Sequence, residues 1–160
     1  MQVDSFNHGP KTVAISDLLF VRRVIVPNEL PAGTNALGKV QTKFDFVYTT
    51  QNAEELCDLA NAERAKPLSV LYTVIDWPYY FAGELASGPL QLLPSEIVDG
   101  VRSAFQIGKF GVRVRNTPQE VFDVIKAAGG QTREILPPAH GEALSEIDRD
   151  FEWEPLPGGK

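Results

Sequence analysis

The stretch Val40-Gln-Thr-Lys-Phe-Asp-Phe-Val-Tyr48 is followed closely by Asn52-Ala-Glu-Glu55, and the two together decide the class of fold. In the first stretch, apolar or aromatic side chains recur at every second position, which predicts a strand over residues 39–49 with one covered face. In the second, Asn52 and Glu55 form a capping box, which predicts the start of a helix. A strand that leads directly into a helix indicates a sheet with helices packed on it.

The segments further along the chain extend this alternation of strands and helices. Residues 68–75 are apolar on both faces and predict a central strand, while apolar residues at helical spacing predict a helix over residues 94–106. Residues 110–115 alternate as a strand, and Thr117-Pro-Gln-Glu120 begins a further helix that Gly129-Gly130 ends. The sequence therefore predicts an α+β fold, with a mixed β-sheet of about five or six strands and about three helices packed on it as a two-layer sandwich.

The chain is expected to consist of one domain with an extended arm at each end. Residues 1–10 are polar and contain Gly9-Pro10, which predicts an N-terminal arm. Residues 11–138 carry the strand and helix patterns and predict a single α+β domain, the number that a chain of 160 residues favours. Within it, residues 27–38 hold two prolines and two glycines and predict a long loop. Residues 139–160 predict an acidic C-terminal tail that contains aromatic residues.

Charge is distributed unevenly along the chain. The formal net charge of the chain is −6. Residues 139–160 carry a net charge of −4, so the other residues together carry only −2. The basic residues Lys109, Arg113 and Arg115 share one predicted strand, but they are too sparse for the basic stripe of a typical nucleic-acid binder. The charge pattern therefore argues against nucleic acid as a partner.

Signals for a membrane or for export are absent from the sequence. No apolar run approaches the roughly 20 residues that a membrane span needs, and the N-terminus lacks the pattern of a secretory signal. The sequence therefore predicts that the protein has no membrane partner. It also predicts that the protein is either cytoplasmic or assembled into a particle.

Residues that carry covalent or metal chemistry are scarce. Cys57 is the only cysteine, and its place beside acidic residues on a helix predicts a core residue rather than a nucleophile. The two histidines, His8 and His140, lie in terminal or proline-rich segments with no carboxylate neighbour to orient them. The stretch Gly33-Thr-Asn-Ala-Leu-Gly-Lys-Val40 departs from a phosphate-binding loop at Val40, which cannot hold a cation. The sequence predicts no catalytic group, no metal and no cofactor.

The C-terminal tail carries the main functional prediction. Acidic and aromatic residues alternate in Asp148-Arg-Asp-Phe-Glu-Trp-Glu-Pro155, as is typical of an extended segment that adds to the edge of a sheet. Two interpretations stay open, because such a segment either docks on another chain or straps its own domain. The residues predicted to bind a partner are Ile147, Phe151, Glu152, Trp153 and Glu154.

These features favour a non-enzymatic protein-interaction or assembly subunit of a multi-subunit particle, for example a viral or phage structural protein, or an inhibitor that binds a partner. The expected partner is a protein, which other copies of the chain can supply. The alternative is a small-molecule-binding domain or an enzyme with a pocket near residues 76–81, at the end of a predicted strand. The residues of that alternative pocket are Asp76, Trp77, Tyr79, Tyr80, Arg113 and Arg115.

Overall fold

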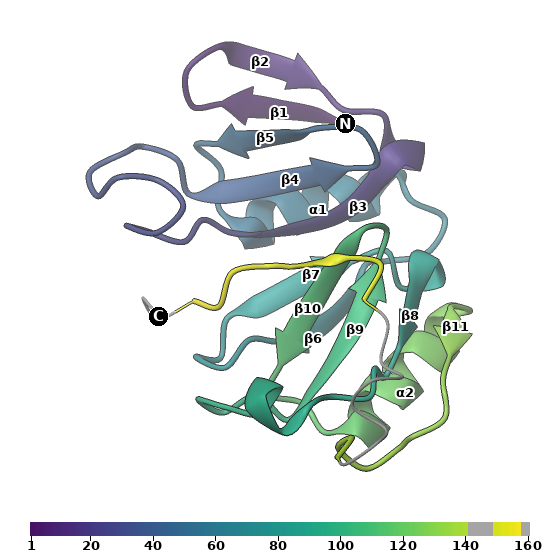
Figure 1. Ribbon diagram of the computed structural model, residues 1–160. Helices are drawn as coiled ribbons and strands as arrows, with labels where there is room; N and C mark the ends of the chain where they lie inside the picture. Colours follow the sequence, from purple (N-terminus) through teal and green to yellow (C-terminus); the bar gives the residue numbers. More distant parts are fainter. Residues whose placement is uncertain (141–148, 158–160) are drawn as a thin grey trace. The chain divides into compact units, whose positions relative to one another are not determined.

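The computed structural model describes residues 1–140 and 149–157 and has a mixed α+β fold (Figure 1). The predicted α+β class is confirmed. The single sheet with about three helices is wrong, because the described residues form two α-helices and two sheets, of seven and five strands. Where the sequence predicts one domain, the chain divides into two compact units. The first unit holds Met1–Val70 and Pro78–Ala82, and the second holds Leu71–Trp77 and the described residues of Gly83–Pro157.

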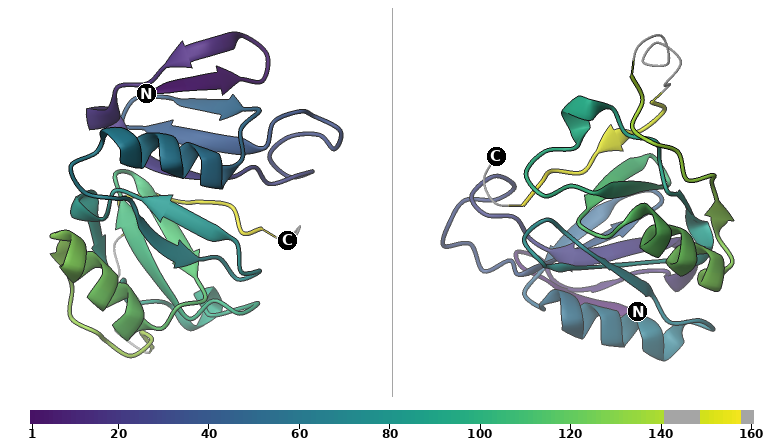
Figure 2. Two further views of the ribbon diagram at one scale, coloured as in Figure 1. Left: turned by 180° about the vertical axis from the view of Figure 1, so that it is seen from behind. Right: turned by 90° about the horizontal axis from the view of Figure 1, so that it is seen from below.

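The seven-stranded sheet has the order β2-β1-β5-β4-β3-β7-β6, and all of it except Leu71 and Tyr72 of β6 belongs to the first unit. Its strands are β1 (Gln2–Ser5), β2 (Gly9–Thr12), β3 (Leu18–Arg23), β4 (Gly38–Thr42), β5 (Phe46–Thr49), β6 (Ser69–Tyr72) and β7 (Pro78–Phe81). A short 3-10 helix, Ile15–Asp17, precedes β3. The helix α1 (Ala53–Glu63) lies along one face of this sheet (Figure 2).

The helix α1 begins where the sequence predicts. The side chain of Asn52 accepts a hydrogen bond from the amide of Glu55 at 2.9 Å. Leu56 and Cys57 are buried in its inward face. Burial, together with the negative charge of Asp58, raises the pKa of the Cys57 thiol, as expected for a core cysteine rather than a nucleophile.

Residues 39–49 form a hairpin of two strands, β4 and β5, so the prediction of one continuous strand is wrong. The turn is held by the Thr42 hydroxyl, which accepts hydrogen bonds from the amides of Phe44 at 3.2 Å and Asp45 at 3.0 Å. It also donates to the Asp45 carboxylate at 2.8 Å. A threonine hydroxyl that bonds to nearby backbone in this way stabilises a turn, which the alternating apolar pattern does not reveal.

The N-terminal residues are ordered as a hairpin, although their polar composition predicts a loose arm. β1 pairs antiparallel with β2, and Ser5 pairs with Thr49 of β5. Val3 is buried, and the N-terminal ammonium of Met1 donates to the carbonyl of Val13 at 2.9 Å. Burial of these few apolar groups and the backbone pairing hold residues 1–10 in the sheet.

Residues 68–75 supply the strand β6 at the end of the sheet order, so the prediction of a central strand is wrong. The chain turns directly after β6, where the carbonyl of Thr73 accepts from the amide of Asp76 at 2.9 Å. The Thr73 hydroxyl accepts from the amide of Trp77 at 3.0 Å, and Asp76 adopts a positive φ of 70°. This tight turn ends the strand before the apolar run does.

The second unit contains the five-stranded sheet, in the order β11-β8-β9-β10-β12. Its strands are β8 (Ala86–Gly88), β9 (Ser103–Ile107), β10 (Phe110–Val114), β11 (Gln131–Thr132) and β12 (Glu152–Trp153). Two short 3-10 helices, Gly83–Leu85 and Pro94–Glu96, lie before and after β8. The helix α2 (Pro118–Ala128) buries Val121 and Ile125.

The helix predicted over residues 94–106 is wrong. Only a single 3-10 turn forms, at Pro94–Glu96, and the chain then reverses at Asp99 and Gly100, which have positive φ angles of 53° and 92°. Residues with positive φ do not continue a right-handed helix. Ala104 and Phe105 belong to β9 instead, and Val101 lies between the turn and that strand.

The helix α2 has both of its predicted caps. The Thr117 hydroxyl accepts from the amide of Glu120 at 3.1 Å, and the Glu120 carboxylate accepts from the amide of Thr117 at 3.0 Å. Gly129 ends the helix in the left-handed conformation, with φ of 84°. These local signals are sufficient to place the helix correctly from sequence.

We expect the substitution Thr117→Ala to lower the free energy of unfolding by about 1 kcal/mol, because it leaves an amide of the first turn without its acceptor. Urea denaturation followed by circular dichroism measures this change. Thr50→Ala is the matched control, since Thr50 is exposed and caps no helix. An equal loss in both variants would contradict the role of the cap.

Candidate functional site

The tail residues predicted to bind a partner lie, where the structure describes them, against the second unit of their own chain. We call residues 149–156 the strap. Its strand β12 runs parallel to β10, with Glu152 opposite Phe110 and Trp153 opposite Gly111. The amide of Glu152 donates to the carbonyl of Lys109 at 2.9 Å. Ile147, the remaining predicted residue, lies outside the described residues.

The aromatic side chains of the strap pack on a small apolar cluster. Phe151, Trp153 and Leu156 contact a buried group formed by Leu90, Leu92, Val101 and Ala104. Gly111 permits this close approach, because a Cβ atom there would lie 2.8 Å from the Trp153 ring and would also overlap the Phe151 ring. The rings of Phe151 and Trp153 meet edge to face, with 4.9 Å between centroids. The strap therefore fills space that the absence of a side chain at position 111 creates.

Polar contacts fix the register of the strap. The carboxylate of Glu96 accepts from Arg149 at 2.6 Å and from the Trp153 indole at 3.1 Å. The Arg113 guanidinium lies over the Trp153 ring, 5.0 Å from its centroid, and donates to the Glu154 carbonyl at 3.3 Å. Burial lowers the pKa of Arg113, although the negative charge of Glu96 opposes that effect.

The two strap glutamates differ in their surroundings. Glu152 is exposed, whereas Glu154 is buried. The amide of Glu154 donates to the carbonyl of Gly111 at 2.8 Å, which extends the pairing beyond β12. Of the predicted partner-binding residues that the structure describes, Glu152 is thus the one with an exposed side chain, and the rings of Phe151 and Trp153 are half-buried.

The residues of the alternative pocket are distributed over both units. In the second unit, Asp76 forms an ion pair with Arg115, whose guanidinium lies over the Tyr72 ring at 5.0 Å from the centroid. The two charged side chains are largely exposed, at 70% for Asp76 and 44% for Arg115. Trp77 is half-buried in the turn that holds Asp76.

The two tyrosines of that prediction belong to β7 in the first unit. Tyr79 is buried, and its ring packs against Phe20 with 4.8 Å between centroids. Tyr80 is half-buried. The structure thus brings Asp76 and Arg115 together, and it places Arg113 beside the strap.

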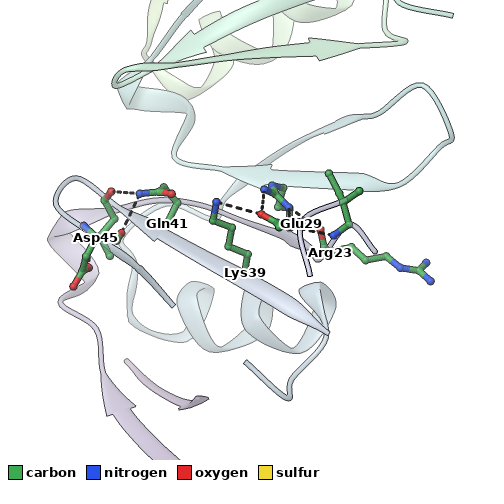
Figure 3. Close-up of polar contacts among 8 residues, drawn as sticks. Arg23, Glu29, Lys39, Gln41 and Asp45 are labelled. Atoms are coloured by element: carbon green, nitrogen blue, oxygen red, sulfur yellow. Dashed lines mark hydrogen bonds and ion pairs between the residues drawn. The ribbon is translucent and has the colours of Figure 1, made fainter. Parts of the chain in front are cut away.

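A buried charged cluster in the first unit was missed by sequence reasoning (Figure 3). Glu29, from the loop after β3, accepts two hydrogen bonds from the guanidinium of Arg22, at 2.8 and 2.7 Å. The Lys39 ammonium lies 3.4 Å from the same carboxylate, and the Ile25 amide donates to it at 3.1 Å. The side chains of Arg22, Glu29 and Lys39 are each less than 10% exposed.

The Glu29 carboxylate is held in its charged form. Burial on its own would raise its pKa, but the hydrogen bonds and charge of Arg22, the amide of Ile25 and the charge of Lys39 together lower it to about 2. The sequence signal for this cluster is an arginine in the middle of an apolar strand. The pair Arg22-Arg23 predicts a bulge or an edge strand at that point, but Arg22 pairs with both β4 and β7, and the irregularity of β3 lies between Leu18 and Phe20.

The hairpin of β4 and β5 ends in an exposed aromatic tip. Gln41 supports the turn from the sheet by donating to the carbonyls of Thr42 and Asp45, both at 3.0 Å (Figure 3). Phe44 is 81% exposed at the turn and Phe46 is 50% exposed at the start of β5. Sequence alternation assigns both rings to a covered face, so their exposure is a finding of the structure.

A hollow of about 250 Å³ lies beside this tip. Its wall contains apolar, cationic and anionic groups, and the residues that line it are Lys11, Thr12, Val13, Ala14, Asp17, Thr42, Phe44, Asp45 and Val47. Lys11 and Asp45 form a long ion pair of 3.7 Å at its rim, and both are exposed. The hollow belongs entirely to the first unit.

Comparisons of this chain with protein-family models, with curated proteins and with solved structures find no match. Among residues 1–140 and 149–157, no group of three or more histidine, cysteine or acidic side chains is placed to hold a metal ion. No helix in the part of the chain that the structure describes is long and apolar enough to span a membrane.

Proposed function

We propose that this chain is a non-enzymatic protein-interaction subunit that assembles with copies of itself through the β4–β5 hairpin. The observation that carries the proposal is the exposure of Phe44, 81% of whose surface faces solvent beside a hollow of about 250 Å³. Interfaces between proteins are enriched in aromatic residues, and such residues supply much of the binding energy when they enter a pocket on the partner.

A second copy of the chain is the partner that this surface suits best. The hollow lies between the β4–β5 hairpin, which carries Phe44, and residues 11–17, and two copies related by a two-fold axis can each place the ring in the other's hollow. The hollow offers Val13, Ala14 and Val47 as apolar contacts for an aromatic ring. Phe46 adjoins the tip and enlarges the apolar area available for contact.

The charges around the hollow are also self-complementary. Lys11 provides a cation, whereas Asp17 and Asp45 provide anions, so a two-fold arrangement can place opposite charges against each other. The ion pair between Lys11 and Asp45 is exposed and long, at 3.7 Å. Such a pair contributes little to the stability of the single chain. One oxygen of the Asp45 carboxylate accepts a hydrogen bond from the Thr42 hydroxyl, whereas the other oxygen and the Lys11 ammonium are available to a partner.

The small-molecule alternative has weaker support. Asp76 and Arg115 neutralise each other in an exposed ion pair, and Arg113 is covered by the Trp153 ring. An anionic ligand would have to displace these contacts before either arginine could bind it.

We expect the full chain to form a dimer whose mass falls to the 17.6 kDa of one chain when Phe44 is replaced by aspartate. The substitution puts a charge where the apolar ring would be buried, which is strongly unfavourable in an interface. Light scattering coupled to gel filtration, over a range of protein concentrations, measures the mass.

The matched control is Leu136→Asp, because Leu136 is also apolar and exposed, at 44%, but lies in the second unit. That variant should keep the mass of the unmodified chain. A chain that stays monomeric at every concentration, or a dimer that survives Phe44→Asp, would overturn the proposal.

A further inference from the structure

The strap contacts its unit in the manner of a bound peptide. It joins the sheet edge through parallel pairing with β10, and β-strand addition of this kind is a general mode of peptide recognition. Two of its backbone amides donate hydrogen bonds, from Glu152 to the carbonyl of Lys109 and from Glu154 to the carbonyl of Gly111. These bonds are independent of side-chain identity, so they provide affinity without specificity.

Specificity comes from three side chains of the strap. Arg149 and Trp153 both bind the Glu96 carboxylate, at 2.6 and 3.1 Å, and the rings of Phe151 and Trp153 occupy the space over Gly111. The pattern that is recognised is therefore an arginine, then an aromatic residue two positions later, then a tryptophan after a further two. We call the residues that read this pattern, Glu96, Gly111 and Arg113 with the apolar cluster beneath the rings, the strap site.

All of these contacts lie between residues 149–156 and either the strap site or the backbone of Lys109, and none requires the two partners to belong to one chain. A segment of the same sequence from another copy would form the same hydrogen bonds and ring contacts. Attachment within one chain raises the effective concentration of the strap at its own site, typically to the order of millimolar. An assembly that holds copies close together can supply a comparable concentration.

We propose that the strap site is a sequence-specific peptide-binding site whose second occupant is the strap of another copy of this chain, so that copies can exchange straps. This surface lies wholly in the second unit. The proposal does not rest on association through the Phe44 hairpin, and either can hold without the other.

The test mixes two full-length variants that complement each other. One carries Phe151→Ala and Trp153→Ala, which destroys its strap and vacates its strap site. The other carries Gly111→Val, which blocks its strap site and releases an intact strap. Both also carry Phe44→Asp, so that association through the hairpin does not contribute. We expect each variant alone to have the mass of one chain and the mixture to form a 1:1 complex of twice that mass in native mass spectrometry.

Two outcomes overturn the proposal. One is the absence of a complex when circular dichroism shows both variants to be folded. The other is a complex that persists when the Gly111→Val chain also carries Trp153→Ala, because that association would not use the strap.

A peptide measurement keeps the test decisive if Gly111→Val does not fold. A labelled peptide of residues 149–157 is titrated into the full chain that carries Phe151→Ala and Trp153→Ala, with fluorescence anisotropy as the readout. Saturable binding that a scrambled peptide does not reproduce supports the proposal. Equal binding of both peptides, or binding of neither to the folded chain, overturns it.

Discussion

Replacing Glu29 with alanine is expected to lower the free energy of unfolding by about 3–5 kcal/mol at neutral pH, the cost typical of removing one partner from a buried ion pair. Glu29 accepts two hydrogen bonds from Arg22 and lies 3.4 Å from Lys39, and all three side chains are buried. Without the carboxylate, both cations lose the anion that offsets their removal from water. Denaturant unfolding followed by circular dichroism measures the loss.

The same carboxylate should make stability fall in acid. Its pKa is about 2 in the folded protein and 4.5 when unperturbed, and a pKa lowered by folding contributes stability above 4.5 that disappears as the pH falls towards 2. The difference corresponds to about 3 kcal/mol. Glu29→Gln resembles the protonated side chain, so its unfolding free energy should lie below that of the unmodified chain at pH 7 and converge with it near pH 2.

Glu63→Gln is the matched control for this prediction. Glu63 forms an ion pair with the N-terminal ammonium, but its side chain is 49% exposed, and exposed pairs typically contribute less than about 1 kcal/mol. Two results would contradict the role given to the buried carboxylate. One is a loss of unfolding free energy in Glu29→Gln that is no larger than the loss in Glu63→Gln. The other is a difference in unfolding free energy between Glu29→Gln and the unmodified chain that stays constant from pH 7 to pH 2.

The parts of the fold that sequence predicts correctly are set by contacts between near neighbours. The caps at Asn52 and Thr117 each bond to an amide three residues away, so the residues that place the helices are adjacent in sequence. Errors arise where a short turn interrupts a regular apolar pattern. The hydroxyls of Thr42 and Thr73 and the positive φ of Asp99 each stop a run that periodicity alone would continue.

The candidate sites depend on contacts that are distant in sequence, which explains why sequence reasoning finds them only in part. Alternation of acidic and aromatic residues predicts an extended segment at the C-terminus, and that segment does pair with a sheet edge. Its acceptor, Gly111, cannot be identified from sequence because the relevant property is the absence of a side chain beside the Trp153 ring. Glu29 is similarly hidden, because a carboxylate in a loop rich in proline and glycine gives no signal of burial.

Replacing Gly130 with alanine is expected to destabilise the second unit by about 3 kcal/mol, the upper part of the range for overpacking. Gly130 follows α2, and a Cβ atom there would overlap the carbonyl oxygen of Gly83 and lie 2.8 Å from that of Ala86. Both oxygens belong to backbone that leads into the five-stranded sheet, so neither can move as a side chain could. Urea denaturation measures the loss.

The neighbouring residue separates this steric effect from a purely conformational one. Gly129 has φ of 84°, in the left-handed region, where alanine typically costs about 1–2 kcal/mol. Gly130 has no positive φ angle. If Gly130→Ala lowers the free energy of unfolding more than Gly129→Ala does, the additional loss therefore comes from the close approach of α2 to the chain around β8. If instead Gly129→Ala is the more harmful substitution, the cap rather than this packing holds the helix in place. Since β8 pairs with β9, which pairs with β10, the close approach at Gly130 also supports the strand that receives the strap.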